Sequence, residues 1–142
     1  MTIRTGLALL TCVVAAWGTA AAQSLPEAVT ETLWQLQRIQ YMDDSVTVAS
    51  DPARYTLRFG RDGRVQVQAD CNRGAGGYET DGSSLRFLPI ALTRALCPAD
   101  SIDTEFAREL ANVVSFVLDG GTLALATAAD TSILTFEAAP EK

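Results

Sequence analysis

The 142-residue sequence contains no histidine, only three cysteines, and fewer basic than acidic residues, with 11 Lys+Arg against 17 Asp+Glu. Without histidine, the chain lacks the most common metal ligand and the usual general base near neutral pH. The formal net charge of −6 argues against a surface that follows nucleic-acid phosphates, since such surfaces concentrate Lys and Arg. We therefore expect no nucleic-acid partner, no cofactor and no bound metal.

The remaining composition is that of a globular domain. Hydrophobic residues make up 48% of the chain and charged residues 20%, which is enough apolar material to bury a core. The length accommodates one domain, or one domain with a targeting segment. Because no fixed-period repeat or low-complexity tract occurs, a single domain is expected.

Residues 1–22 have the pattern of a secretory signal peptide. Arg4 supplies the positive charge, residues 6–17 form an uncharged apolar run, and three alanines end at Ala22. The run is shorter than the roughly 20 apolar residues of a membrane-spanning helix. The pattern predicts cleavage after Ala22, no membrane span, and a periplasmic or secreted protein whose formal charge is −7 once Arg4 is lost.

Cys12 raises the question of a lipid anchor. It lies inside the apolar run and follows Thr11, where a small residue would precede a lipidated cysteine. Lipidation at this position would also leave an apolar region too short for the export machinery. A lipid anchor is therefore not expected.

Two cysteines remain after cleavage, Cys71 and Cys97, and they are 26 positions apart. An oxidising compartment and an even number of thiols favour one disulfide bond. In the loop-entropy model this bond stabilises the fold by about 3 to 4 kcal/mol. A metal site would need more ligands nearby, and a redox pair usually has two residues between its cysteines. A buried pair of free thiols stays compatible with the sequence.

Alternation of apolar and polar residues predicts about seven β-strands. Asp62-Gly63 and Asp81-Gly82 are typical of the positive-φ turns that join hairpin strands. The predicted strands are 33–39, 55–59, 65–69, 78–80, 85–87, 123–125 and 133–136.

One amphipathic helix is predicted to begin near Asp100 or Ser101, because apolar residues recur at helical spacing from Ile102 to Val117. From Val113 onward the residues are rich in β-branched side chains and also fit a strand. The other segments are predicted as a flexible lead-in at 23–31, a surface loop at 41–54, a Gly-rich loop at 73–77 and a tail at 138–142.

Short turns and the lack of strand–helix alternation exclude a doubly wound sheet. We expect a mainly β fold with one α-helix (α+β), either a single strongly curved antiparallel sheet or a small β-barrel, with the helix packed against it. Seven aromatic residues at inward-facing positions are expected in the core: Trp34, Tyr55, Phe59, Tyr78, Phe87, Phe106 and Phe136.

Several short motifs follow one another in a characteristic order. They are Trp34-x-Leu36, Tyr55-x-Leu57-x-Phe59 with Asp62-Gly63, Cys71-Asn72, Gly77-Tyr78, Thr93-x-x-x-Cys97, Glu105-Phe106 and Gly121-x-Leu123-x-Leu125. Each motif is weak alone, but the ordered series over about residues 32–137 resembles the META domain family, which includes HslJ-like heat-shock and envelope proteins.

The resemblance implies a compact antiparallel β fold with one helix, exported in many bacteria and often lipid-anchored. It also implies an association with envelope stress and drug tolerance, novobiocin included, without an established enzymatic activity. The family supplies no catalytic residues. The residues that match its motifs are expected to be structural: Cys71, Asn72, Gly77, Tyr78, Thr93 and Cys97.

Other candidate sites are weak. Asn72 is compatible with ligand binding, but an Asn near Gly is more often found bonding its own backbone in a turn, which we favour. Residues 74–77 lack the Lys-Ser/Thr ending and the following helix of a phosphate loop. No G-x-S-x-G motif occurs, and Asp43, Asp44 and Asp51 lack calcium-loop spacing. Hydrolysis by a pair of carboxylates stays open, because sequence gives no distances.

The leading functional hypothesis is a non-enzymatic, monomeric envelope protein that acts through its surface on an unknown protein partner, as a stress or drug-tolerance module. One alternative is an inhibitor of a secreted hydrolase such as lysozyme, since the charge of −7 would steer the protein toward a basic enzyme. The other is a carrier of small apolar molecules, which requires an empty barrel interior.

Overall fold

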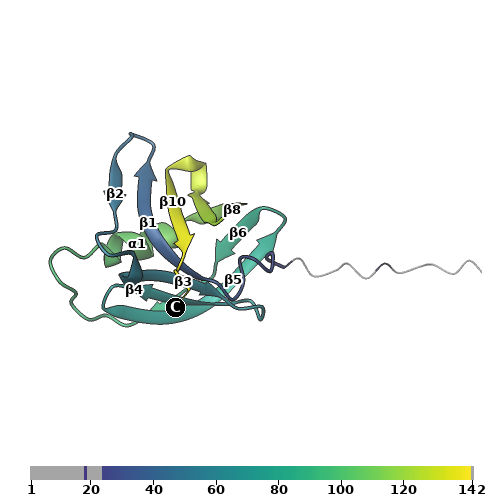
Figure 1. Cartoon of the computed structure of the whole chain (residues 1–142), viewed down its shortest axis with the longest axis horizontal. Coiled ribbons are helices and arrows are strands. Elements are labelled where there is room, and N and C mark those ends of the chain that lie inside the picture. The colour runs from purple at the N-terminus through teal and green to yellow at the C-terminus, as the bar shows by residue number, and fades with distance from the viewer. Residues whose placement is uncertain (1–17, 19–23, 142) are drawn as a thin grey trace, which may run out of the picture.

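The computed structural model describes residue 18 and residues 24–141, so almost all of the predicted signal peptide lies outside the described residues. The described chain contains ten strands, one α-helix and two short 3-10 helices (Figure 1). The strands are β1 (Leu33–Tyr41), β2 (Val46–Val48), β3 (Tyr55–Phe59), β4 (Arg64–Ala69), β5 (Asn72–Asp81), β6 (Ser84–Phe87), β7 (Ala91–Leu92), β8 (Val113–Asp119), β9 (Thr122–Thr127) and β10 (Ser132–Ala138). The helices are η1 (Pro52–Arg54), α1 (Asp103–Leu110) and η2 (Ala128–Asp130).

Eight of the strands close into an antiparallel barrel. Their order is β1, β3, β4, β5, β6, β8, β9 and β10, and β10 pairs back with β1. The seam between β6 and β8 is the narrowest, with a single paired position at Ser84 and Ser115. Two short strands lie outside this ring, since β2 extends β1 as a hairpin and β7 adds to β5. The prediction of a mainly β fold with one helix and a small barrel is confirmed.

Packed side chains fill the interior of the barrel. All seven aromatic residues predicted for the core are buried, and Phe116 of β8 joins them. The rings of Phe59 and Tyr78 meet edge to face at a centroid distance of 5.3 Å. From α1, Phe106 and Leu110 reach the same core and are fully buried. The helix is therefore an integral part of the core.

The Gly-rich segment 73–77 is part of β5, and its prediction as a loop was wrong. Its glycines let other segments cross the strand at close range. A Cβ atom on Gly74 would lie 1.7 Å from the carbonyl oxygen of Ala91 in β7. The lack of side chains, which usually indicates a loop, here serves close packing. The segment 41–54 is also not a continuous loop, because it contains β2 and η1.

The helix is shorter than its apolar pattern predicted, and it begins later. Residues 113–119 form β8, as their β-branched side chains allowed. The residue before α1 is Ile102, not Asp100 or Ser101, and the hydroxyl of Tyr55 accepts its amide hydrogen at 3.0 Å. Ser101 still contributes, since its Oγ accepts the amide of Asp103 at 3.2 Å. A hydroxyl from β3, distant in sequence, thus fixes the start of the helix.

The segment predicted as a flexible lead-in supplies part of the core. Leu25 and Val29 are buried, and the indole nitrogen of Trp34 donates to the carbonyl of Val29 at 3.0 Å. Thr30 forms an isolated parallel bridge with Phe59. The packed domain therefore begins before residue 32.

Candidate functional site

Residues 93–98 follow β7 in the connection to α1, and they form no helix, strand or turn. We call this segment the braced loop. It bows out at the left of Figure 1, beside α1. The predicted disulfide between Cys71 and Cys97 is present, with a Cα–Cα distance of 5.5 Å, and it ties the loop to the start of β5. The loop is thus exposed in space but fixed at one end to the barrel wall.

The side chain of Asn72, which is only 5% exposed, lies beneath the braced loop and grips Ala95 at two points. Its Oδ1 accepts the Ala95 amide hydrogen at 2.7 Å, and its Nδ2 donates to the Ala95 carbonyl at 3.1 Å. Thr93 adds a third bond, donating from Oγ1 to the Asn72 Oδ1 at 3.0 Å. The favoured interpretation of Asn72 as a local turn residue is therefore wrong, because its partners lie more than 20 positions away.

An ion pair supports the strand connection just before the disulfide. Arg54 donates from Nε and one terminal nitrogen to the two carboxylate oxygens of Asp70, at 2.7 and 2.6 Å. These hydrogen bonds hold the pKa of the Asp70 carboxyl below its usual range. Asp70 is buried and has a left-handed backbone with a φ of 57°. The bidentate pair thus fixes the turn that delivers Cys71 and Asn72 to the loop.

The outer edge of the braced loop is open. Within residues 24–141, neither Arg94 nor Leu96 makes a backbone hydrogen bond, whereas Ala95 between them is bonded through both its amide and its carbonyl. The side chain of Leu96 is fully exposed, with a relative accessibility of 101%. The loop therefore presents an aliphatic side chain and unpaired peptide groups on a fixed support, an arrangement suited to binding another chain.

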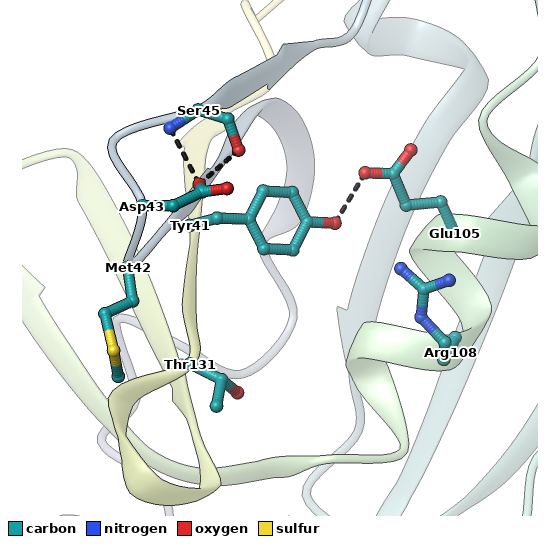
Figure 2. A pocket seen from close by; sticks show the side chains of 7 residues that line it. All are labelled: Tyr41, Met42, Asp43, Ser45, Glu105, Arg108 and Thr131. Atoms are coloured by element: carbon teal, nitrogen blue, oxygen red, sulfur yellow. Dashed lines mark hydrogen bonds between the residues drawn. The ribbon is translucent and has the colours of Figure 1, made fainter.

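A second candidate, which we call the Tyr41 pocket, is an open depression of about 620 Å³ between β1, the β1–β2 turn and α1 (Figure 2). Its lining residues are Tyr41, Met42, Asp43, Ser45, Glu105, Arg108 and Thr131.

The carboxylate of Glu105 accepts hydrogen bonds from two hydroxyl groups. Tyr41 donates to its Oε1 at 2.5 Å, as Figure 2 shows, and Thr47 donates to the same oxygen at 2.9 Å. Burial, and then the bond to Glu105 and its charge, raise the pKa of the Tyr41 phenol far above its ordinary value. The phenol therefore acts as a hydrogen-bond donor and not as a base at neutral pH.

Glu109, one helical turn further along α1, is also fully engaged. Its carboxylate accepts from Arg108 Nε at 3.0 Å and from the Ser132 hydroxyl at 2.6 Å. The amide of Ser132 donates in turn to Thr127 Oγ1 at 2.8 Å. This network fastens the helix to β9 and β10. Glu109 does not line the Tyr41 pocket, but both Glu105 in the pocket and Glu109 beside it accept hydrogen bonds from side chains of neighbouring elements.

The residues predicted from sequence divide into two groups in the structure. Cys71, Asn72, Thr93 and Cys97 come together at the braced loop. Tyr78 lies further along β5, where its hydroxyl donates to the carbonyl of Gly60 at 2.5 Å.

Gly77 precedes Tyr78 in β5, and its carbonyl accepts the Leu88 amide at 2.9 Å. Sequence reasoning missed Leu96, Arg54 and Asp70 as parts of a site. An isolated exposed leucine carries no signal in sequence, and neither does an ion pair between residues 16 positions apart.

Two further observations concern only residues 18 and 24–141. In this part of the chain, no group of three or more His, Cys, Asp or Glu side chains is placed to hold a metal ion. None of its helices has the length and apolar character needed to cross a membrane.

The described residues form a small closed β-barrel with one helix, and the braced loop is exposed at its surface. The family model of the META domain matches residues 27–140, so the chain belongs to the META domain family. No curated protein matches the chain.

Solved structures share the fold. An NMR structure of a protein from Burkholderia xenovorans is 19% identical, with a TM-score of 0.66, covering 87% of this chain and 94% of the other. A crystal structure of a DUF4847 family protein from Bacteroides vulgatus is 15% identical, with a TM-score of 0.57, covering 80% and 96%. A further NMR structure is 23% identical, with a TM-score of 0.58, covering 81% and 95%. At these identities the similarity shows the fold alone.

Proposed function

We propose that the chain is an exported, non-enzymatic META domain that binds a protein partner in the cell envelope, as part of stress or drug tolerance. Three features support this proposal: the signal-peptide pattern of residues 1–22, the disulfide between Cys71 and Cys97, and membership of the META domain family. A disulfide of this kind is typical of proteins in oxidising compartments. The predicted destination is the periplasm or the medium, without a lipid anchor.

The observation that carries the proposal is the braced loop. Its inner edge is tied down by Asn72 and the disulfide, and its outer edge and Leu96 face solvent. A segment that is already ordered loses little conformational freedom when it binds, so more of the contact energy contributes to affinity. This favours protein binding over two other classes of function, a carrier of small apolar molecules and a hydrolase.

The carrier hypothesis is disfavoured by the packing of the barrel. Trp34, Phe59 and Phe136 are among the side chains that are fully or almost fully buried in the interior. A small apolar ligand would have to displace such side chains, because core packing is close to that of organic crystals. Hydrolysis by a pair of carboxylates is also disfavoured, because Glu105 and Glu109 are both held by hydroxyl or guanidinium donors of the protein.

A combined test separates these classes. Purified oxidised protein is expected to show no turnover of peptidoglycan fragments or phospholipids. Turnover that disappears in the Glu105→Gln variant would contradict the proposal and identify an enzyme. For binding, a photo-crosslinker placed at Arg94 is expected to capture one envelope protein in cells. Capture should disappear with Leu96→Asp and persist with Val117→Asp, which alters an exposed apolar residue elsewhere, 62% exposed on β8.

Export is tested independently by fusing residues 1–30 to a reporter enzyme that is active only outside the cytoplasm. Reporter activity and an amino terminus at Gln23 are expected. An inactive reporter would contradict the proposed location.

A further inference from the structure

The hydrogen bonds of the braced loop alternate along the chain. The amide and carbonyl of Ala95 both point to the Asn72 side chain, and the backbone groups of Arg94 and Leu96 are left without partners among the described residues. A segment whose peptide groups are bonded on one side and open on the other is what a strand-adding cleft recognises, since the cleft pairs with every second residue. The alternation therefore points to recognition of the backbone as well as of a side chain.

Leu96 supplies the side-chain part of this recognition. Single exposed apolar residues are common and mean nothing by themselves. Leu96 differs because its neighbours Ala95 and Cys97 are both fixed, one by Asn72 and the other by the disulfide. A fully exposed aliphatic side chain held in place by its two neighbours is the form of anchor that fills a pocket in a partner.

The support also has a consequence for cleavage. Hydrolysis of the Leu96–Cys97 peptide bond would consume one water and produce a Leu96 carboxylate and a Cys97 amine. Ala95 would stay held by Asn72, and Cys97 would stay attached to Cys71, so both new ends would remain near their original positions. In a serine endopeptidase, cleavage passes through an acyl-enzyme, in which the Leu96 carbonyl carbon is esterified to the catalytic serine and the Cys97 amine is already released. Held nearby at a high effective concentration, this amine attacks the ester, re-forms the peptide bond and releases the serine hydroxyl, so the cleaved products leave slowly.

We propose that the braced loop enters the substrate cleft of a secreted endopeptidase with an apolar primary pocket, inserts Leu96 into that pocket and inhibits the enzyme. This inference rests on the proposed function and names its partner by chemical class. The formal charge of −7 expected after cleavage of residues 1–22 favours an enzyme with a basic surface, so association should be faster at low salt.

The test uses the exported, oxidised protein and three serine endopeptidases. Chymotrypsin and subtilisin have apolar primary pockets, and trypsin has an acidic one. We expect tight inhibition of at least one apolar-pocket enzyme and little inhibition of trypsin. Leu96→Ala should weaken inhibition by roughly 30-fold or more. Leu96→Lys should transfer inhibition to trypsin, a gain that misfolding cannot produce.

Val48→Ala is the matched control, because Val48 is also an exposed apolar residue, 65% exposed on β2, and its truncation should leave inhibition unchanged. Mass spectrometry should find the loop intact, or cut only at Leu96–Cys97 in equilibrium with the intact form.

Three results would overturn the inference: no inhibition of any of the three enzymes, rapid complete cleavage of the loop with loss of inhibition, or inhibition that Leu96→Lys leaves unaltered. If inhibition is absent while the Leu96-dependent crosslink to an envelope protein persists, this inference fails and the proposed function stands. If both are absent, both fail.

Discussion

The braced loop and the Tyr41 pocket both adjoin α1, and side-chain hydrogen bonds hold both, yet they differ in what they leave unpaired. At the Tyr41 pocket, the hydroxyls of Tyr41 and Thr47 converge on Glu105 and join three elements to one another. At the braced loop, the Asn72 amide group bonds Thr93, both backbone groups of Ala95 and the Cys97 sulfur, and it leaves the outer side of the segment open.

The contrast shows that a polar network can either join elements of the fold to one another or hold a loop in place at the surface. Glu109 is buried and receives its hydrogen bonds from the Ser132 hydroxyl and from Arg108, so that network fixes the position of the helix. Asn72 is equally buried, but most of its partners lie in the exposed braced loop, and only Asp103 belongs to α1. We therefore expect variants at the Tyr41 pocket to affect stability alone, and variants at the braced loop to affect stability and binding in different proportions.

The largest effect should come from Phe106→Ala, which removes a core contact of α1, the helix that both regions adjoin. Phe106 is fully buried, with its ring 5.9 Å from that of Tyr55. Truncating a buried Phe typically costs about 3–5 kcal/mol of unfolding free energy. Urea denaturation followed by the fluorescence of Trp34 measures the loss. A loss below about 1 kcal/mol would show that the helix is not part of the core.

The double variant Cys71→Ser/Cys97→Ser should come next, with a loss of about 3 to 4 kcal/mol in the loop-entropy model. The change in the folded structure should be confined to the braced loop, because the disulfide joins it to β5 and not to the Tyr41 pocket. Denaturation with and without reductant measures the loss, and NMR shifts locate it. Wild-type protein whose stability is unaffected by reductant would contradict this expectation.

Asn72→Ala should cost about 1–3 kcal/mol, because it removes the several hydrogen bonds that this buried side chain makes to Thr93 and Ala95. It should also release Ala95 while the disulfide stays closed. The informative comparison is between two changes in free energy, that of unfolding and that of binding to the partner. Asn72→Ala should weaken binding by more than its loss of folding stability accounts for. Equal proportional losses would mean that Asn72 supports only the fold.

Tyr41→Phe should have the smallest effect, a loss of about 0.5–1.5 kcal/mol, since Glu105 keeps its bond from Thr47. It should leave partner binding unchanged.

The raised pKa of Tyr41 also predicts a pH dependence. The folded state keeps the phenol protonated, so its contribution is fully present below the unfolded pKa of about 10 and is lost as the pH rises above it. Tyr41→Phe should reduce this alkaline loss of stability. An alkaline unfolding curve identical to that of the wild type would contradict the assignment.

Local patterns predicted much of the barrel and little of the loop. The hairpin of β3 and β4 was predictable because Tyr55, Leu57 and Phe59 alternate with polar residues up to an Asp-Gly turn. The extent of β5 was not, because the glycines that allow β7 to cross it are typical of loops.

The disulfide followed from counting cysteines and from the predicted compartment. The grip of Asn72 on Ala95 did not, since the two residues are 23 positions apart and meet only once the barrel has closed.

Residue-by-residue amide hydrogen exchange on the oxidised protein tests the central claim most directly. If the braced loop is held on its inner edge and open on its outer edge, the Ala95 amide should exchange several-fold more slowly than those of Arg94 and Leu96. Asn72→Ala should remove that difference. Equally fast exchange at all three amides in the wild-type protein would show that the loop is not held by Asn72, and would contradict the account.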